Sequence, residues 1–256
     1  MPSPAAARVR RISVTRYVTP LREGGSLPAI VEADDNGLYV LKFRGAGQGA
    51  RALVAELVAG ELARVAGLPV PEIVFAELDP DLARTEPDPE IQELIRASGG
   101  LNLALDYLPG SVMFDPVADA PDGFLASSIV WFDALVTNID RTAKNTNLLM
   151  WHRKLWMIDH GAAMYFHHGT SDFVSRAKDP FTAVKEHVLL RLADAIEEAD
   201  TVLAPRLTQS AVEEVVARVP PEWAPEAHRY TAYFMARLEE PRAFVEEALR
   251  ARAQHL

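Results

Sequence analysis

The chain has 256 residues, 49% of them hydrophobic, which is enough for one large domain or for two halves that share a core. Its formal net charge of -10 argues against broad nucleic-acid binding, because an acidic surface repels nucleic-acid phosphates. The absence of cysteine excludes disulfides and cysteine nucleophiles and fits a cytoplasmic location, and the lack of a long apolar segment predicts no membrane contact.

Three strands are predicted in the first 43 residues. Residues 11–18 alternate polar and apolar side chains, and residues 29–32 and 38–43 are short apolar runs joined by a hairpin turn of sequence DNG. Lys42 is the charged residue of the third strand. A lysine in an apolar strand needs an anionic partner if it is buried, and otherwise faces water on a sheet edge.

Two glycine-containing segments lie in this region, one between the first two strands and one after the third. Gly24, Gly25 and Ser26 lie between the first two strands, where amides without a neighbouring Cβ can approach phosphate oxygens; the alternative is a flexible hairpin loop. Residues 45–49 form a second glycine run before a helix predicted at 50–65, where phosphates can also bind.

The next segments complete the β-rich half. The predicted helix at 50–65 carries Glu56 beside its apolar stripe, with Glu61 as a competing candidate partner for a basic residue. Strands are predicted at 73–78 and 101–108, separated by an acidic, proline-rich insertion that is briefly helical.

A polar loop and a hairpin follow the helix predicted at 123–138. The hairpin strands are residues 148–151 and 155–158. Asp140 and Asn145 enter this hairpin and Asp159 leaves it at the same end, so the three side chains are expected to converge. The alternative is an ordinary Asx-rich turn.

Such a convergence suits phosphoryl transfer from a nucleotide. One carboxylate accepts the proton of the incoming hydroxyl, a role that fits Asp140, and oxygen ligands hold Mg2+ against the phosphates, a role that fits Asn145 and Asp159. Arg141 and Lys144 lie in the same loop and would steady phosphate charge or the loop itself.

The remaining chain is predicted to be helical. Apolar residues at helical spacing predict helices at 185–199, 208–219, 225–239 and 241–254, whose apolar faces should pack together.

The pattern Asn138-x-Asp140-Arg141-x-x-Lys144-Asn145, followed by a hairpin and Asp159-His160-Gly161, resembles the HipA-like kinases. These are bacterial relatives of the phosphatidylinositol 3-kinase-like branch of the protein kinase fold. The resemblance implies an α+β, two-lobed kinase-like fold, with a β-rich N-lobe at residues 1–105 and a helical C-lobe at 106–256.

The resemblance also implies roles for individual residues. Lys42 would contact the phosphates of ATP and pair with Glu56, and the backbone of Tyr107 and Leu108 would form the hinge that binds adenine. The loop of these kinases that corresponds to residues 24–26 can carry a regulatory phosphoserine, for which Ser26 would be the candidate. The acceptor implied is a Ser or Thr hydroxyl of a protein.

Thr142 departs from the pattern, since many relatives have His two positions after the catalytic Asp. A neutral hydroxyl cannot carry the charge that an imidazole can. Two alternatives therefore stay open, namely a small-molecule phosphotransferase and a nucleotide-binding pseudokinase that acts as a regulatory module.

Overall fold

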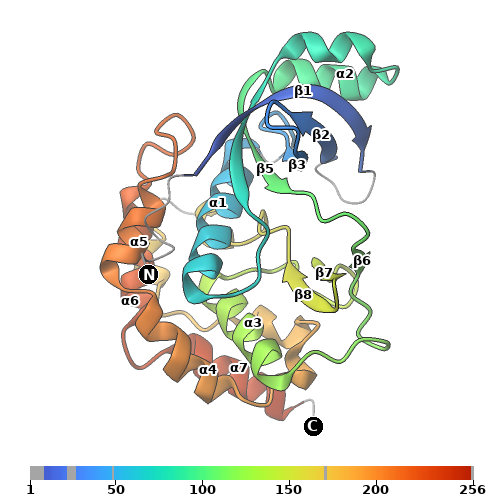
Figure 1. Cartoon of the computed structure of the whole chain (residues 1–256). Coiled ribbons are helices and arrows are strands. Elements are labelled where there is room, and N and C mark those ends of the chain that lie inside the picture. Colours follow the sequence, from blue (N-terminus) through green and yellow to red (C-terminus); the bar gives the residue numbers. More distant parts are fainter. Residues whose placement is uncertain (1–8, 22–26, 48, 170–171, 255–256) are drawn as a thin grey trace.

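The structure, a computed structural model, describes residues 9–21, 27–47, 49–169 and 172–254. The strands of the N-terminal part lie at the top of the view in Figure 1 and most of the helices at the bottom, with α1 (Gly49–Ala66) and a small second sheet between them. The predicted α+β class is confirmed. Gly24, Gly25 and Ser26 lie outside the described residues.

Five strands close into a barrel in the N-terminal part. They are β1 (Arg11–Pro20), β2 (Ala29–Ala33), β3 (Leu38–Lys42), β4 (Ile73–Leu78) and β5 (Gly100–Asp106), in the order β1-β2-β3-β5-β4. Antiparallel pairs form this order and a parallel pairing of β1 with β4 closes it. Alternate side chains such as Ile12, Val31 and Leu41 fill the interior. Closure leaves no sheet edge open, so Lys42 is not an edge-strand residue.

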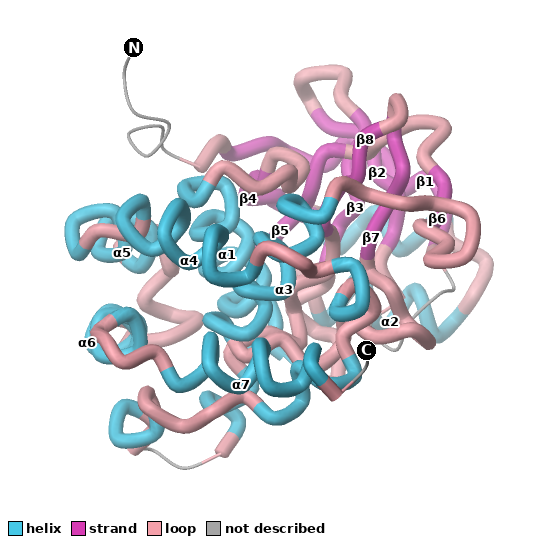
Figure 2. The backbone as a smooth tube through the Cα atoms, turned by 90° about the horizontal axis from the view of Figure 1, so that it is seen from below, coloured by secondary structure: helices cyan, strands magenta, loops and turns pink. Residues whose placement is uncertain are grey.

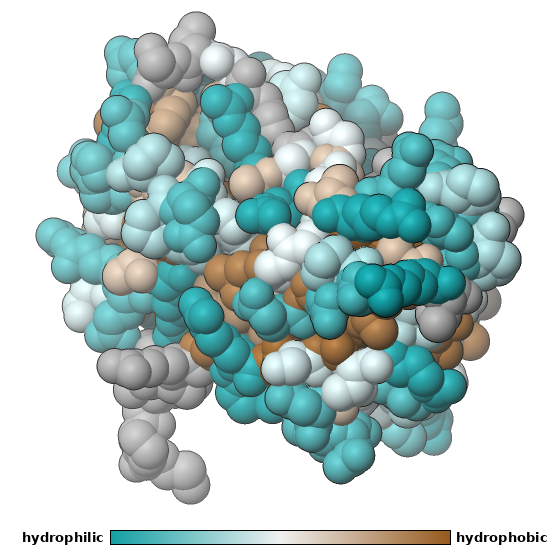
Figure 3. Space-filling model, turned by 90° about the horizontal axis from the view of Figure 1, so that it is seen from above, coloured by the Kyte–Doolittle hydropathy of each residue, from teal (hydrophilic) through white to brown (hydrophobic). Residues whose placement is uncertain are grey.

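The insertion between β4 and β5 covers one end of the barrel. It forms a 3-10 helix (Pro80–Thr85) and α2 (Pro89–Ala97). Asp88 caps the N-terminus of α2, and its carboxylate accepts a hydrogen bond from the Glu90 amide. Ile91 and Ile95 of α2 pack into the barrel core. Figure 3 views this end of the molecule, where hydrophilic side chains surround a band of apolar ones.

Helix α1 is buried on all sides. Every residue from Leu53 to Ala63 is buried, including two glutamates. Its side chains share one core with the outer faces of β4 and β5 and with the C-terminal helices. A helix held in this way presents its polar residues at fixed positions, which matters for Glu56.

The C-terminal part combines a small sheet with helices. The sheet contains β6 (Val112–Met113), β7 (Leu148–Trp151) and β8 (Lys154–Met157), of which β6 was not predicted. The helices are α3 (Gly123–Val136), α4 (Ile196–Leu203), α5 (Gln209–Val216), α6 (His228–Leu238) and α7 (Ala243–Ala253). Figure 2 shows them packed on the side of α1 opposite to most of the strands. Buried α3 lies at the centre of this packing.

The helix predicted at 185–199 is wrong in its first half. Residues 182–186 and 190–192 are 3-10 turns, and the α-helix begins only at Ile196. The Val188 amide donates to the Arg141 carbonyl instead of to its own turn, and His187 binds Asp133. Tertiary hydrogen bonds thus replace the helical ones here.

None of the helices in the described part of the chain combines the length and the apolar content that a bilayer span requires.

Candidate active site

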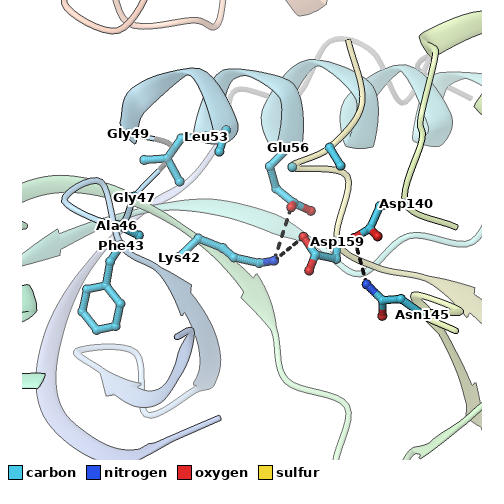
Figure 4. Close-up of a pocket in the computed structure, with 13 residues that line it drawn as sticks. Lys42, Phe43, Ala46, Gly47, Gly49, Leu53, Glu56, Asp140, Asn145 and Asp159 are labelled. Atoms are coloured by element: carbon cyan, nitrogen blue, oxygen red, sulfur yellow. Dashed lines mark hydrogen bonds and ion pairs between the residues drawn. The ribbon is translucent and has the colours of Figure 1, made fainter. Parts of the chain in front are cut away.

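A cavity of about 200 Å³ lies where β3, the first turns of α1 and the two ends of the β7-β8 hairpin meet. Five of the predicted polar residues line it, namely Lys42, Glu56, Asp140, Asn145 and Asp159. Figure 4 shows these side chains pointing toward one another from β3, α1 and the two loops. Residues more than 100 positions apart in the chain therefore share one site.

Lys42 is bound between two carboxylates. Its ammonium lies 2.7 Å from Asp159 Oδ1 and 3.5 Å from Glu56 Oε2, with 11% of its side chain exposed. Burial by itself lowers the pKa of Lys42, but the charges of Asp159 and Glu56 outweigh it and raise the pKa above its ordinary value. Lys42 therefore keeps its positive charge within the cavity.

Glu56 is the buried partner of this lysine. Its side chain is 1% exposed, and Oε1 lies 3.5 Å from Nδ1 of His160, the residue after Asp159. Burial alone raises the pKa of Glu56, yet the charge of Lys42 and the interaction with His160 lower it to about 2. Glu61, the competing candidate, pairs with Arg64 and Arg218 instead.

Asp140 is oriented by two amide groups. Its Oδ2 accepts hydrogen bonds from Asn145 Nδ2 at 2.8 Å and from Asn147 Nδ2 at 3.2 Å. Its Oδ1 has no protein partner within the described part of the chain and remains available to a hydroxyl. The bond from Asn145 also turns the Oδ1 of Asn145 away from Asp140 (Figure 4).

Asp159 follows β8 in a left-handed backbone conformation, with φ 53°. A non-glycine residue in this region usually marks a turn or a constrained site. Its side chain is 36% exposed and reaches Lys42. The turn at the end of the hairpin therefore places a carboxylate in the cavity.

Arg141 does not line the cavity. It is 1% exposed, forms an ion pair with Asp133 of α3, and donates to the carbonyls of Asn147 and Ile158. His187 binds the same Asp133 carboxylate at 2.9 Å. Burial tends to raise the pKa of Asp133, but the charge of Arg141 and the bond from His187 lower it overall. Of the two roles considered for Arg141, these contacts fit steadying the loop and not contacting phosphate.

Lys144 and Thr142 lie on the outer part of this loop. Lys144 is exposed and is not among the residues that line the cavity. The Thr142 amide donates to the Asn145 carbonyl at 2.9 Å, and Thr142 pairs with His187 across an isolated bridge. Thr142 therefore shapes the turn that presents Asn145.

The predicted hinge lies outside the cavity wall. Tyr107 and Leu108 are not among the described residues that line it, and the Tyr107 amide donates to the Leu38 carbonyl at 3.0 Å. Instead part of the wall is formed by Phe43, Ala46 and Gly47, which precede α1, and by Gly49, the first residue of α1. The second glycine run, at 45–49, thus borders the cavity, where a Cβ added at Gly47 or Gly49 would meet no heavy atom within 4 Å.

The cavity gathers three carboxylate side chains, Glu56, Asp140 and Asp159, around the single ammonium of Lys42. Carboxylate and amide oxygens are the ligands that a hard divalent cation prefers. Among the described residues, no three His, Cys, Asp or Glu side chains are placed so that they could together hold a metal ion. Mg2+ commonly takes one or two protein ligands and completes its shell with water and phosphate oxygens, and Asp159 with Asn145 fits that pattern.

Comparison with solved structures finds kinases of similar fold. The chain is similar in structure to the Helicobacter pylori proinflammatory kinase CtkA, with a TM-score of 0.59 and 11% identity over 95% of this chain and 99% of that one. It is also similar to a Golgi casein kinase with Mn/ADP bound, with a TM-score of 0.50 and 12% identity over 96% of this chain and 73% of that one. At such identities the likeness shows a kinase fold alone.

Sequence comparison settles the family. A search of curated proteins gives no match. The family model described as HipA-like kinase matches residues 14–251, which confirms the resemblance in the motif. The chain therefore belongs to the HipA-like kinase family, whose reaction class is phosphoryl transfer.

Proposed function

We propose that this protein is an ATP- and Mg2+-dependent kinase that transfers the γ-phosphoryl group to a hydroxyl, most specifically a Ser or Thr of a protein. In this proposal residues 1–105 and 106–256 act as the two lobes of the kinase. The observation that carries the proposal is the Lys42 ammonium bound to both Glu56 and Asp159 in the cavity that also holds Asp140 and Asn145.

The contacts of the cavity support separate roles for its residues. Lys42 would bind nucleotide phosphates while Glu56 holds its ammonium, and Asp159 and Asn145 would hold Mg2+ through carboxylate and amide oxygens. The cation, when bound, supplies positive charge for the phosphates. The Lys42–Asp159 contact of 2.7 Å must then open, because both groups turn to the nucleotide and its metal.

Asp140 would act as the base. Two amides hold its Oδ2, which leaves Oδ1 to accept the proton of the acceptor hydroxyl. A protein acceptor is supported by family membership and by the name of the structurally similar casein kinase, which refers to a protein substrate. Gly24, Gly25 and Ser26 remain candidates for phosphate contacts, and Tyr107 and Leu108 for adenine contacts after the two lobes rearrange.

Nucleotide binding is the first test. Isothermal titration with ATP, with and without Mg2+, compares wild type with Asp159→Asn and with Glu198→Gln, an exposed carboxylate of α4 that does not line the cavity. We expect Mg2+-dependent binding in wild type and in Glu198→Gln, and its loss in Asp159→Asn. Binding of equal strength in all three proteins would contradict the assignment of Asp159.

Turnover is the second test. Asp140→Asn should keep Mg2+-ATP affinity within about threefold while ADP release falls by about a hundredfold or more, because only proton transfer and acceptor orientation are lost. Parallel assays with protein and with small-molecule hydroxyl acceptors separate the two substrate classes. Nucleotide binding without any turnover would instead favour a regulatory pseudokinase.

A further inference from the structure

Unsatisfied polar atoms concentrate directly behind the cavity. Both carboxylate oxygens of Glu56 and both ring nitrogens of His160 are buried and make no hydrogen bond of normal geometry within the described structure. Their nearest approach is 3.5 Å, between His160 Nδ1 and Glu56 Oε1. Glu56 Oε2 also lies 3.5 Å from the Lys42 ammonium, so these contacts are ion pairs without a close hydrogen bond. Buried polar atoms without a close hydrogen bond are costly, so their concentration at one place requires an explanation.

His160 lies between two residues of the cavity, Asp159 in the chain and Glu56 in space. Its backbone follows Asp159, the expected metal ligand, while its fully buried ring lies against α1 beside Glu56. Gly60, one helical turn after Glu56, borders the ring: a Cβ there would be in ordinary contact with His160 Nδ1 at 3.8 Å, whereas it would clash with the Ile73 side chain at 2.4 Å. The imidazole therefore packs closely against α1 beside Glu56.

We infer that His160 is a positioning residue for phosphoryl transfer, whose Nδ1–H holds Glu56 Oε1 and so directs Oε2 toward Lys42. This inference rests on the proposed kinase function and extends it to a residue that the motif left without a role. It explains why Glu56 has two neighbours on opposite sides, Lys42 at Oε2 and His160 at Oε1, each at 3.5 Å. Hydrogen bonds at active sites are often long before substrate binds and tighten afterwards.

The need for such support follows from the contacts of Lys42. Lys42 is closer to Asp159 (2.7 Å) than to Glu56 (3.5 Å). When Lys42 and Asp159 separate, Glu56 is the carboxylate that still contacts the ammonium. A Glu56 side chain held from behind would keep Lys42 aimed at the phosphates, whereas an unsupported one could turn.

A simple packing role makes a different prediction. If His160 only fills space, an apolar residue of similar size should serve equally well or better, because it would remove two unsatisfied nitrogen atoms. If His160 acts through Glu56, the donor itself matters. Asn is the conservative variant, since its side-chain amide can place a donor near the position of Nδ1.

The experiment compares His160→Leu, His160→Phe and His160→Asn with wild type, using Mg2+-ATP titration, steady-state kinetics and thermal unfolding. Leu62→Ala serves as the control, because Leu62 is a fully buried residue of α1 that does not line the cavity. We expect kcat/KM for ATP to fall about tenfold or more in the Leu and Phe variants, with a matching rise in the dissociation constant of Mg2+-ATP. The KM for the acceptor should not change, and His160→Asn should recover most of the loss.

A double-mutant cycle identifies the residue through which His160 acts. In a Glu56→Gln background, His160→Leu should add less than about twofold to the loss, because its partner is already changed. Leu62→Ala should lower the unfolding temperature and leave nucleotide affinity unchanged below it. Wild-type affinity in His160→Leu or His160→Phe, or losses that multiply independently of Glu56, would overturn the inference. A wild type that does not bind Mg2+-ATP would instead overturn the proposed function itself.

Discussion

The strongest quantitative prediction concerns Arg141, which the structure buries instead of placing at the phosphates. Arg141→Met leaves the buried Asp133 carboxylate with His187 and Asn138 as its partners among the described residues, and it leaves the carbonyls of Asn147 and Ile158 without the guanidinium. Removing one partner of a buried ion pair costs about 3–5 kcal/mol. For a chain of this size each kcal/mol lowers the unfolding temperature by about 2–4 °C, so we expect a decrease of about 6–20 °C.

Urea unfolding followed by circular dichroism measures this cost, and titration with Mg2+-ATP at a temperature where the variant is folded measures affinity. We expect affinity within about threefold of wild type, because Arg141 does not line the cavity. Turnover should fall more than affinity, because the loop that carries Asp140 loses its anchor to α3. A lower free energy of unfolding with nearly unchanged nucleotide affinity is the result expected of a residue that anchors the loop.

The double variant Arg141→Met/Asp133→Asn provides the matched control. It removes the buried charge on both sides, so it should be more stable than Arg141→Met alone. An Arg141→Met protein of wild-type stability with much weaker ATP binding would refute the reasoning, because it would mean that the guanidinium reaches the phosphates.

Two further predictions concern Gly47, before α1, and Asp35, in the turn between β2 and β3. Gly47→Ala should leave the free energy of unfolding within about 1 kcal/mol of wild type, because its Cβ meets no heavy atom within 4 Å, yet weaken Mg2+-ATP binding by about tenfold if phosphates approach this backbone. Titration and urea unfolding of one preparation test both parts, and unchanged affinity would exclude close approach here. Hydrogen bonds from Tyr39, Arg10 and the Gly37 amide lower the pKa of Asp35 to about 2. The stability that this carboxylate contributes is present above its unfolded pKa near 3.8 and is lost as pH falls toward 2, so the advantage of wild type over Asp35→Asn in urea should shrink between pH 5 and pH 2.5. A difference that stays constant over that range would contradict the assignment.

Much of the local structure could be predicted from short-range pattern. The five barrel strands, the β7-β8 hairpin, α1 and α3 all lie within a few residues of their predicted bounds, because alternation, helical spacing and turn residues are encoded by neighbours in the chain. The HipA-like motif could be recognised from the sequence for the same reason, because its residues lie within 24 consecutive positions, 138 to 161.

Side-chain direction could not be predicted in the same way. Arg141 turns inward because Asp133 and two carbonyls surround it, and residues 187–188 leave the predicted helix to meet this same loop. Asn147, which shares Asp140 with Asn145, gave no signal beyond another polar residue in a turn. These contacts depend on which elements pack together.

The sequence by itself determined the kinase motif, most of the secondary structure and the set of residues that carry the expected chemistry. The pairing of Lys42 with Glu56 was expected from the sequence and is present in the structure. Tertiary structure alone decided that Arg141 is buried against Asp133, that Gly47 and Gly49 border the cavity, and that His160 lies behind Glu56. The physical reason is that periodicity reports only which face of an element is buried, whereas the partner of a buried charge is set by elements distant in the chain that exclude water around it.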